Sequence, residues 1–179
     1  MQITEKELES IICKNLTTQE GCEKLLERGL HINSKPNRIF RQLDLNPYGR
    51  ADIITATKHS FYSESMQTIC SHICLHIYEL KIEPLKSDDI DQLYRYAQAL
   101  KEITDDRRNH YSIECTLIGP SVNSGHYIFN HLDCGMFTFE YTIEGILFSS
   151  SNSGWHKGTG NLSLSDITPN NSIFNEAIY

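Results

Sequence analysis

Residues 51–57, Ala-Asp-Ile-Ile-Thr-Ala-Thr, and residues 68–81, Thr-Ile-Cys-Ser-His-Ile-Cys-Leu-His-Ile-Tyr-Glu-Leu-Lys, are the two segments that decide the fold. Both are rich in β-branched and other strand-forming side chains, which indicates two β-strands. A polar segment of roughly residues 58–67 separates them and is predicted to be a loop. The sequence therefore predicts that the two strands pair as an antiparallel hairpin.

Two helices and a strand are predicted on the N-terminal side of this hairpin. Thr4 can cap the first helix, and Glu7 follows three residues later, as in a capping box. The second helix covers residues 19–28 and ends at Gly29, a residue suited to a C-terminal cap. A strand is expected over residues 38–45. The apolar stripe of the first helix consists of Leu8, Ile11, Ile12 and Leu16.

A helix and further strands are predicted on the C-terminal side. Ser87 is expected to cap a helix that runs to about Ile103 and buries Ile90, Leu93, Ala97 and Leu100. A charged linker over residues 105–109 precedes a strand over residues 111–118, and residues 137–148 are expected to form a hairpin. This order describes a single α/β or α+β domain over residues 1–148, with residues 149–179 as a loop-rich tail packed on the same domain.

Composition and charge narrow the class of protein. The chain has 179 residues with 39% hydrophobic side chains, which suits one folded core and excludes a disordered tail or a coiled coil. No apolar run reaches the roughly 20 residues of a membrane helix, and the N-terminus lacks the features of a signal peptide. We therefore expect a cytoplasmic protein that contacts no membrane and keeps its six cysteines as free thiols. The net charge of −7 argues against non-specific coating of nucleic acid.

Three charged side chains stand out in and after the predicted hairpin. Asp52 lies early in the first strand, while Glu79 and Lys81 end the second strand two residues apart and therefore share one face. Burying such charges is costly unless they find partners. Two carboxylates and the backbone carbonyl of Leu80 would suit Mg²⁺ or Mn²⁺, and Lys81 could orient an attacking water or neutralise a phosphate. The simpler interpretation is an ion pair between Glu79 and Lys81 at a strand end.

Two residues of the following helix extend this set. Gln92 and Tyr96 are four residues apart and therefore share one helical stripe, beside the predicted apolar face. If the helix packs against the end of the preceding strand, both side chains can point toward Glu79. The alternative is that Gln92 is an ordinary solvated residue and that Tyr96 lies at the boundary of the core.

A second candidate metal site lies within the second strand. Cys70, His72, Cys74 and His76 alternate and therefore share one face of the strand. Four consecutive positions on one face span roughly 20 Å, which is too far for one tetrahedral zinc ion. We therefore expect these side chains to pack on a half-buried sheet.

The motifs Gly-Arg-Ala-Asp52, Tyr-Glu79-Leu-Lys81 and Gln92-Leu-Tyr-Arg-Tyr96, in this order, resemble those of the PD-(D/E)xK nuclease superfamily. The last motif resembles the QxxxY motif of its RecB-like branch, and an earlier Leu-Glu-Arg-Gly-Leu segment with Arg41-Gln42 is similar to the NucS-type branch. The resemblance covers residues 4–103. Ala51 stands where the pattern carries a proline, and the 27-residue step from Asp52 to Glu79 implies an extended hairpin.

The resemblance implies a restriction-endonuclease-like mixed β-sheet flanked by helices, and Mg²⁺- or Mn²⁺-dependent hydrolysis of DNA phosphodiester bonds, as an endonuclease. It also implies a metal-ligating glutamate on the first helix, for which Glu5 matches. Candidates for DNA contact flank the motifs and are Arg41, Arg50, Lys86 and Arg95. The alternative is a catalytically inactive nuclease-fold protein that binds DNA or regulates a partner. Either protein could act as a homodimer or through a recruiting protein.

Overall fold

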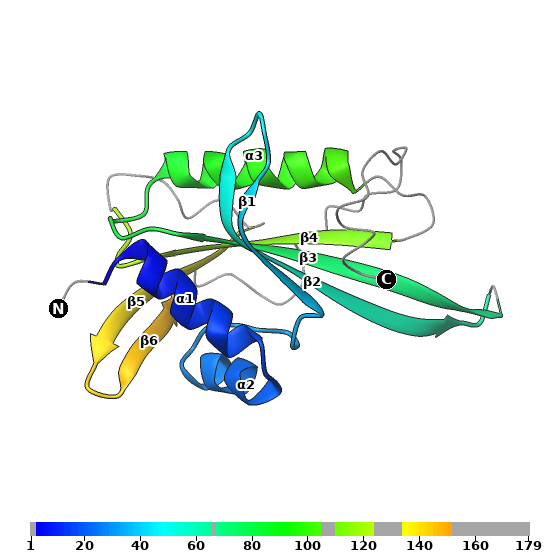
Figure 1. Cartoon of the computed structure of the whole chain (residues 1–179), viewed down its shortest axis with the longest axis horizontal. Coiled ribbons are helices and arrows are strands. Elements are labelled where there is room, and N and C mark those ends of the chain that lie inside the picture. Colours follow the sequence, from blue (N-terminus) through cyan, green and yellow to red (C-terminus); the bar gives the residue numbers. More distant parts are fainter. Residues whose placement is uncertain (1–2, 66, 105–109, 124–133, 152–179) are drawn as a thin grey trace.

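A six-stranded mixed sheet forms the centre of the molecule, as seen in a computed structural model of the chain (Figure 1). The structure describes residues 3–65, 67–104, 110–123 and 134–151. Within these residues the helices are α1 (Glu5–Leu16), α2 (Gln19–Glu27) and α3 (Ser87–Ile103). The strands are β1 (Arg38–Asp44), β2 (Arg50–Ser63), β3 (Thr68–Leu80), β4 (His110–Gly119), β5 (Cys134–Thr142) and β6 (Gly145–Ser150). The fold is therefore α+β, as the sequence predicted.

The strands follow one another across the sheet in the order β1-β2-β3-β4-β5-β6. The pairs β1–β2, β2–β3 and β5–β6 are antiparallel, whereas β3–β4 and β4–β5 are parallel. A parallel pair needs a crossover connection, and α3 supplies it between β3 and β4. This arrangement places the N-terminal part of α3 next to the end of β3, where the predicted charged residues lie.

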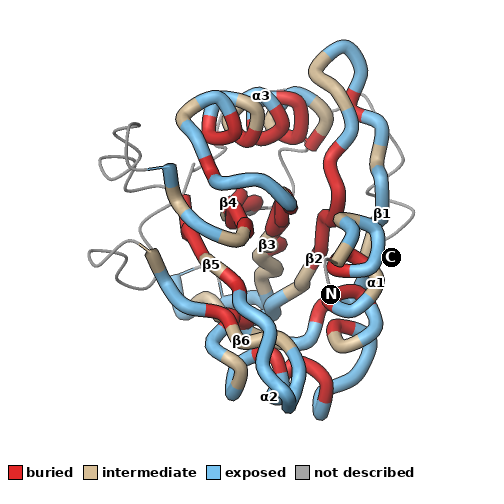
Figure 2. Tube along the Cα trace, turned by 90° about the vertical axis from the view of Figure 1, so that its left-hand side faces the viewer, coloured by how far each residue is buried: buried red, intermediate tan, exposed pale blue. Residues whose placement is uncertain are grey.

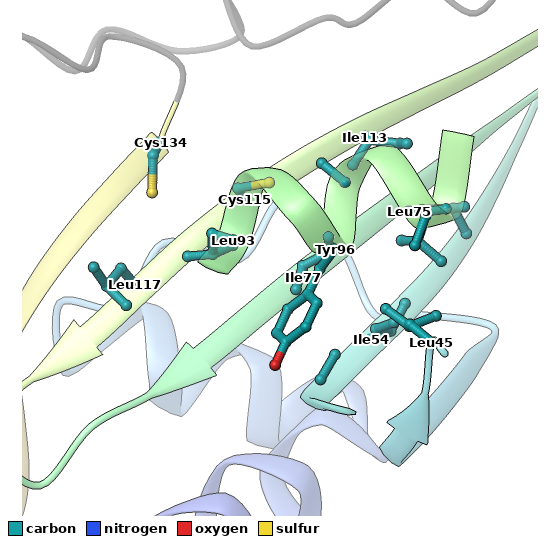
Figure 3. Packing of buried hydrophobic residues seen from close by; sticks show 14 of the residues in the cluster. Leu45, Ile54, Leu75, Ile77, Leu93, Tyr96, Ile113, Cys115, Leu117 and Cys134 are labelled. Carbon is teal, nitrogen blue, oxygen red and sulfur yellow. The ribbon is translucent and has the colours of Figure 1, made fainter. Parts of the chain in front are cut away.

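Helices cover both faces of the sheet: α3 lies on one face, while α1 and α2 lie on the other (Figures 1 and 2). Side chains alternate along each strand, so neighbouring residues enter different cores. Ile54 packs in the core beneath α3, whereas Ile53 packs in the core beneath α1. Figure 3 shows the first of these cores, in which Leu93 and Tyr96 of α3 lie over the sheet. The sheet therefore lies between two hydrophobic cores, one beneath α3 and one beneath α1 and α2.

The first helix begins as the sequence predicts. Thr4 Oγ1 accepts a hydrogen bond from the backbone N–H of Glu7 at 3.2 Å, and the Glu7 carboxylate accepts one from the backbone N–H of Thr4 at 2.8 Å. Leu8 and Ile12 are buried, but Ile11 is 39% exposed, so its assignment to the apolar stripe was wrong. The reason is that the buried stripe of α1 is rotated relative to the predicted one and includes Glu9 and Cys13 instead of Ile11.

Three predicted boundaries differ from the structure. The predicted loop over residues 58–67 is wrong for its first half, because β2 continues to Ser63 and pairs with β3 as far as Ser63↔Thr68. Backbone pairing tolerates polar side chains here, since this two-stranded part extends past the helices (Figure 1). The N-cap of α3 is Lys86 rather than Ser87, and the Asp89 carboxylate accepts the Lys86 backbone N–H at 2.9 Å. The last hairpin continues to Ser150.

Some expectations concern residues that the structure does not describe. The charged linker over residues 105–109 and the tail from residue 152 onward lie outside the described residues. Among the residues that are described, no helix combines the length and apolar character that crossing a membrane requires.

Candidate functional site

Asp52 and Glu79 stand opposite each other at the end of the β2–β3 pair. The register pairs Ile53 with Tyr78 and Ile54 with Ile77, so the next position along the two strands places Asp52 opposite Glu79. Glu79 lies on the sheet face that α3 covers, because it is two residues from Ile77. Asp52 lies between Ala51, which belongs to the core beneath α3, and Ile53, which belongs to the core beneath α1. Asp52 is 5% exposed and Glu79 is 2% exposed. The structure therefore brings two acidic groups together in a buried environment.

Hydrogen bonds hold the Asp52 carboxylate on both of its oxygens. The backbone N–H of Leu80 donates to Oδ2 at 2.8 Å, and the side-chain amide of Gln42 donates to Oδ1 at 3.0 Å. Burial raises the pKa of Asp52, and these two hydrogen bonds oppose that rise. The Asp52 carboxylate thus has one orientation, set by β3 on one side and by β1 on the other.

Glu79 has one oxygen with a partner and one oxygen without. Its Oε1 accepts a hydrogen bond from Lys81 Nζ at 2.7 Å, while Oε2 is buried and finds no donor among the described residues. Burial raises the pKa of Glu79 to about 7, and repulsion from Asp52 adds to the rise. An unsatisfied buried acceptor costs about 1–3 kcal/mol. Glu79 Oε2 is therefore the one carboxylate oxygen of the Asp52–Glu79 pair that has no hydrogen-bond donor among the described residues.

Lys81 connects Glu79 to α3. Its Nζ donates to Glu79 Oε1 and also to Gln92 Oε1 at 3.0 Å. Burial lowers the pKa of Lys81, but the attraction and hydrogen bond of Glu79, together with Asp89 and Asp52, outweigh this effect and raise the pKa above its usual value. Lys81 is therefore an ammonium group at neutral pH, suited to donating a hydrogen bond rather than to removing a proton.

Gln92 and Tyr96 continue the hydrogen-bonded chain along α3. The Gln92 side-chain amide donates to the Tyr96 hydroxyl at 2.5 Å, and that hydroxyl donates to the backbone carbonyl of Arg50 at 2.8 Å. Gly49 lets the Tyr96 ring approach, because it has a φ of +119° and a Cβ there would lie 3.2 Å from the ring. The i, i+4 pair of the sequence thus links Lys81 to the start of β2.

A third acidic group, Glu9, reaches the site from α1. Glu9 is 3% exposed, and Arg41 Nε donates to its Oε1 at 2.6 Å. The Gln42 amide donates to Glu9 Oε2 at 2.9 Å as well as to Asp52. Glu5 lies one turn earlier and is partly exposed; burial raises its pKa, with a further rise from Asp52 and an opposing effect of Lys81. Glu5, the predicted ligand, is therefore within electrostatic reach of the site.

Sequence reasoning missed Glu9 and the role of Gln42. The helical pattern of the sequence places Glu9 at the edge of the buried face of α1. In the structure Glu9 is itself buried, together with Leu8 and Ile12. The position of Glu9 beside the apolar stripe was the sequence feature from which its burial could have been predicted. Arg41, expected to contact DNA, has its guanidinium on Glu9 and Ser10 in this structure.

The other candidate cations are exposed. Arg50, Lys86 and Arg95 all lie at the surface, at the start of β2, at the N-cap of α3 and within α3. Arg50 and Lys86 therefore lie at the ends of the elements that carry Asp52 and Gln92, whereas Arg95 lies in the middle of α3. This placement leaves their side chains accessible to a phosphate backbone.

The donor set fits a hard divalent cation better than zinc. Among the described residues, no three His, Cys, Asp or Glu side chains form a group that could hold a metal ion by themselves. Mg²⁺ and Mn²⁺ need fewer protein ligands, because they keep several waters and bind through one or two carboxylates. The buried Asp52–Glu79 pair offers two carboxylates of this kind, and Glu79 Oε2 has no donor among the described residues. A ligand role for the Leu80 carbonyl stays a prediction.

The Cys/His face of β3 lies on the other side of the sheet. His72 Nε2 is 2.8 Å from Ser112 Oγ, and His76 Nε2 is 2.7 Å from Thr116 Oγ1. His76 Nδ1 also lies 3.3 Å from Glu114 Oε2. His72, His76, Ser112 and Glu114 line a cavity of about 210 Å³. Their imidazoles have hydroxyl partners on β4, as half-buried sheet packing requires.

Comparison of the chain with protein-family models, with curated proteins and with solved structures finds no match. A function for this chain is therefore inferred from the residues of the site and from their geometry.

Proposed function

We propose that this protein is a metal-dependent DNA nuclease with a restriction-endonuclease-like fold. The observation that carries the proposal is the buried Asp52–Glu79 pair, in which Glu79 Oε2 has no donor among the described residues while Oε1 holds Lys81. A simple ion pair at a strand end would need neither a second buried carboxylate nor a link to α3. The hydrogen bond from Lys81 to Gln92 adds a contact that such an ion pair does not require.

The topology is consistent with this proposal. Asp52 and Glu79 come from adjacent antiparallel strands, and α3 crosses from β3 to the parallel strand β4. A mixed sheet between helical layers is what the motif resemblance implies. Helix α1 lies on the opposite face and brings Glu9 to the edge of the site.

In the proposed reaction, Asp52 and Glu79 would hold Mg²⁺ or Mn²⁺, with the Leu80 carbonyl as a further ligand. Glu5 stays a predicted ligand, because it forms no metal-holding group with Asp52 and Glu79 among the described residues. When bound, such a cation lowers the pKa of a coordinated water and stabilises charge on the phosphate. The Lys81 ammonium donates a hydrogen bond to a phosphate oxygen that gains charge as the phosphodiester is attacked. Gln92 orients Lys81, and Tyr96 orients Gln92, through the hydrogen bonds already described.

The test of this function is cleavage of a supercoiled plasmid and of matched single-stranded DNA, duplex DNA and RNA. We expect cleavage of DNA in Mg²⁺ or Mn²⁺ and none in excess EDTA. Nicking of the closed circle would identify an endonuclease, because an exonuclease needs an end. Binding of DNA without cleavage under every metal condition would instead favour an inactive nuclease-fold binding protein, which the net charge of −7 does not exclude.

Gln92→Ala is expected to lower cleavage by about tenfold or more, because loss of a group that orients an active-site residue has effects of this size. The change removes contacts to Lys81 and Tyr96 and should cost at most about 2 kcal/mol of folding free energy. Cleavage rates and thermal unfolding are measured together. The matched control is Gln98→Ala on the same helix, since Gln98 is exposed and its amide donates to Glu102, away from the site. Equal rates for the two variants would remove Gln92 from the mechanism.

DNA binding is expected to weaken steeply with salt, because phosphate contacts release counterions. Single changes Arg50→Ala, Lys86→Ala and Arg95→Ala should each reduce the slope of log K against log salt by about 1. Binding is measured by fluorescence anisotropy in EDTA, which prevents metal-dependent cleavage. Arg28→Ala is the control, because Arg28 donates to the Glu144 carbonyl at the β5–β6 turn. If none of the three substitutions alters the slope of log K against log salt, DNA binds elsewhere on the protein.

A further inference from the structure

Gln42 has an unusual backbone conformation in the middle of an edge strand. Its φ is +49°, a left-handed value that glycine and asparagine adopt far more readily than glutamine. The register pairs Arg41 with Ile53 and Leu43 with Ala51, so Gln42 stands opposite Asp52. Residues held in such conformations cluster at functional sites. The backbone conformation of Gln42 therefore points to a role of its side chain at the site.

The side-chain amide of Gln42 joins two buried carboxylates from different elements. Its Nε2 lies 3.0 Å from Asp52 Oδ1 on β2 and 2.9 Å from Glu9 Oε2 on α1. An amide nitrogen carries two hydrogens, so one can serve each carboxylate. Asp52 and Glu9 are buried, whereas Gln42 itself is exposed. The contact is thus a bridge between two acids and not part of a core.

All four carboxylate oxygens of these two acids have a partner, and the Gln42 amide is the partner of two of them. Asp52 Oδ2 receives the Leu80 N–H, and Glu9 Oε1 receives Arg41 Nε, which also neutralises Glu9. Because an amide is uncharged, it can hold both carboxylates without competing with a cation for Asp52. A lysine or an arginine at this position would bring a positive charge to the same oxygen.

We propose that Gln42 is a positioning residue that fixes the orientation of Asp52 for metal binding and couples Asp52 to α1 through Glu9. This inference rests on the proposed metal-dependent function. Gln42 acts through Asp52 and touches neither the reacting phosphate nor the water. Its contribution is the geometry of the Asp52 carboxylate, because residues that hold a metal ligand by hydrogen bonds tune the affinity of the site.

Gln42→Gly is the most informative variant, because it removes the amide and also suits the left-handed backbone. Gln67 provides a matched control: it has the same φ of +49° and lies in the β2–β3 turn, away from the site. Mn²⁺ affinity is measured by titration calorimetry on the full chain for wild type, Gln42→Gly and Gln67→Gly, with thermal unfolding recorded in EDTA. We expect Gln42→Gly to bind Mn²⁺ about 10–100-fold more weakly. Its unfolding midpoint in EDTA should also fall, because Asp52 Oδ1 and Glu9 Oε2 lose their donor. Gln67→Gly should match wild type in affinity.

The outcomes separate this role from the proposed function. If wild type binds Mn²⁺ and Gln42→Gly binds it equally well, the positioning role is wrong and the metal site stands. If wild type neither binds Mn²⁺ nor cleaves DNA, the proposed function is wrong and the role falls with it. A purely structural role would lower the unfolding midpoint without weakening Mn²⁺ binding, which also contradicts the proposal. Cleavage by Gln42→Gly should recover as Mn²⁺ is raised, since the defect lies in affinity.

Discussion

Replacing Lys81 with alanine is expected to lower the rate of DNA cleavage by about 10²–10³-fold, the usual loss when one hydrogen-bond donor to a developing negative charge is removed. Lys81 is the only ammonium that the described contacts place on Glu79, and Gln92 holds it from the other side. No other group in that chain of contacts carries a positive charge. Cleavage is measured in single-turnover conditions at saturating Mn²⁺, so that a change in metal affinity does not enter the rate.

The same substitution also changes stability, and the structure gives its direction. Glu79 is buried, and its Oε1 loses its ionic partner when Lys81 is removed. Leaving one member of a buried pair without its partner is destabilising, so the metal-free variant should unfold at a lower temperature. Bound Mn²⁺ should restore part of that loss, because it interacts with the folded state only. Thermal unfolding with and without Mn²⁺ measures both effects.

Lys101→Ala is the matched control, since Lys101 lies in the last turn of the same helix that carries Gln92. This variant should keep the cleavage rate and the unfolding temperature of wild type. If Lys81→Ala unfolds early yet cleaves at the wild-type rate, Lys81 is only the ion-pair partner of Glu79. That result would leave the proposed mechanism without its cationic group.

Asp52→Asn is expected to weaken Mn²⁺ binding by more than about 100-fold, beyond the range for residues that merely support a metal ligand. The substitution removes one of the two buried carboxylates but keeps the shape of the side chain. Its remaining oxygen can still accept the backbone N–H of Leu80. The loss of affinity therefore reports charge and ligation rather than a disrupted fold. Calorimetric titration of Mn²⁺ into wild type and variant gives the comparison.

The unfolding temperature of metal-free Asp52→Asn should stay close to that of wild type, because two effects oppose each other. The Asn amide nitrogen cannot accept the Gln42 hydrogen bond that Asp52 Oδ1 accepts, whereas the loss of the Asp52 charge is favourable for Glu79. Repulsion from Asp52 contributes to the raised pKa of Glu79, so removing the Asp52 charge relieves an unfavourable interaction in the folded state. Asp44→Asn on β1 is the control, because Asp44 is exposed and holds only the Asn46 amide among the described side-chain contacts. Equal Mn²⁺ affinity in wild type and Asp52→Asn would remove the metal site from this position.

Periodicity and local chemistry were sufficient for most of the elements. The alternating segment 68–81 is β3, the stripe that begins after Ser87 is α3, and Thr4 with Glu7 forms the capping box of α1. These features depend on residues within a few positions of one another, so a single sequence contains the information. The extent of β2 beyond residue 57 was missed, because its polar residues are held by pairing with β3 and not by their own preference.

Local spacing also determines part of the site. Glu79 and Lys81 share a strand face because they are two residues apart, and Gln92 and Tyr96 share a helix face because they are four apart. The hydrogen bond between Lys81 and Gln92 depends on α3 packing beside the end of β3. The sequence suggested this packing but did not determine it.

The contacts among α1, β1 and β2 were decided by the tertiary structure alone. Nothing in the sequence indicates that Arg41 would bind Glu9, 32 positions away, or that Gln42 would join Glu9 to Asp52. Such partners are chosen when helix and sheet pack, because burial makes an unpaired charge or acceptor costly and selects whichever donor lies within reach. The sequence by itself determined which residues could carry the chemistry. Packing decided which of their atoms acquired partners and left Glu79 Oε2 without one among the described residues.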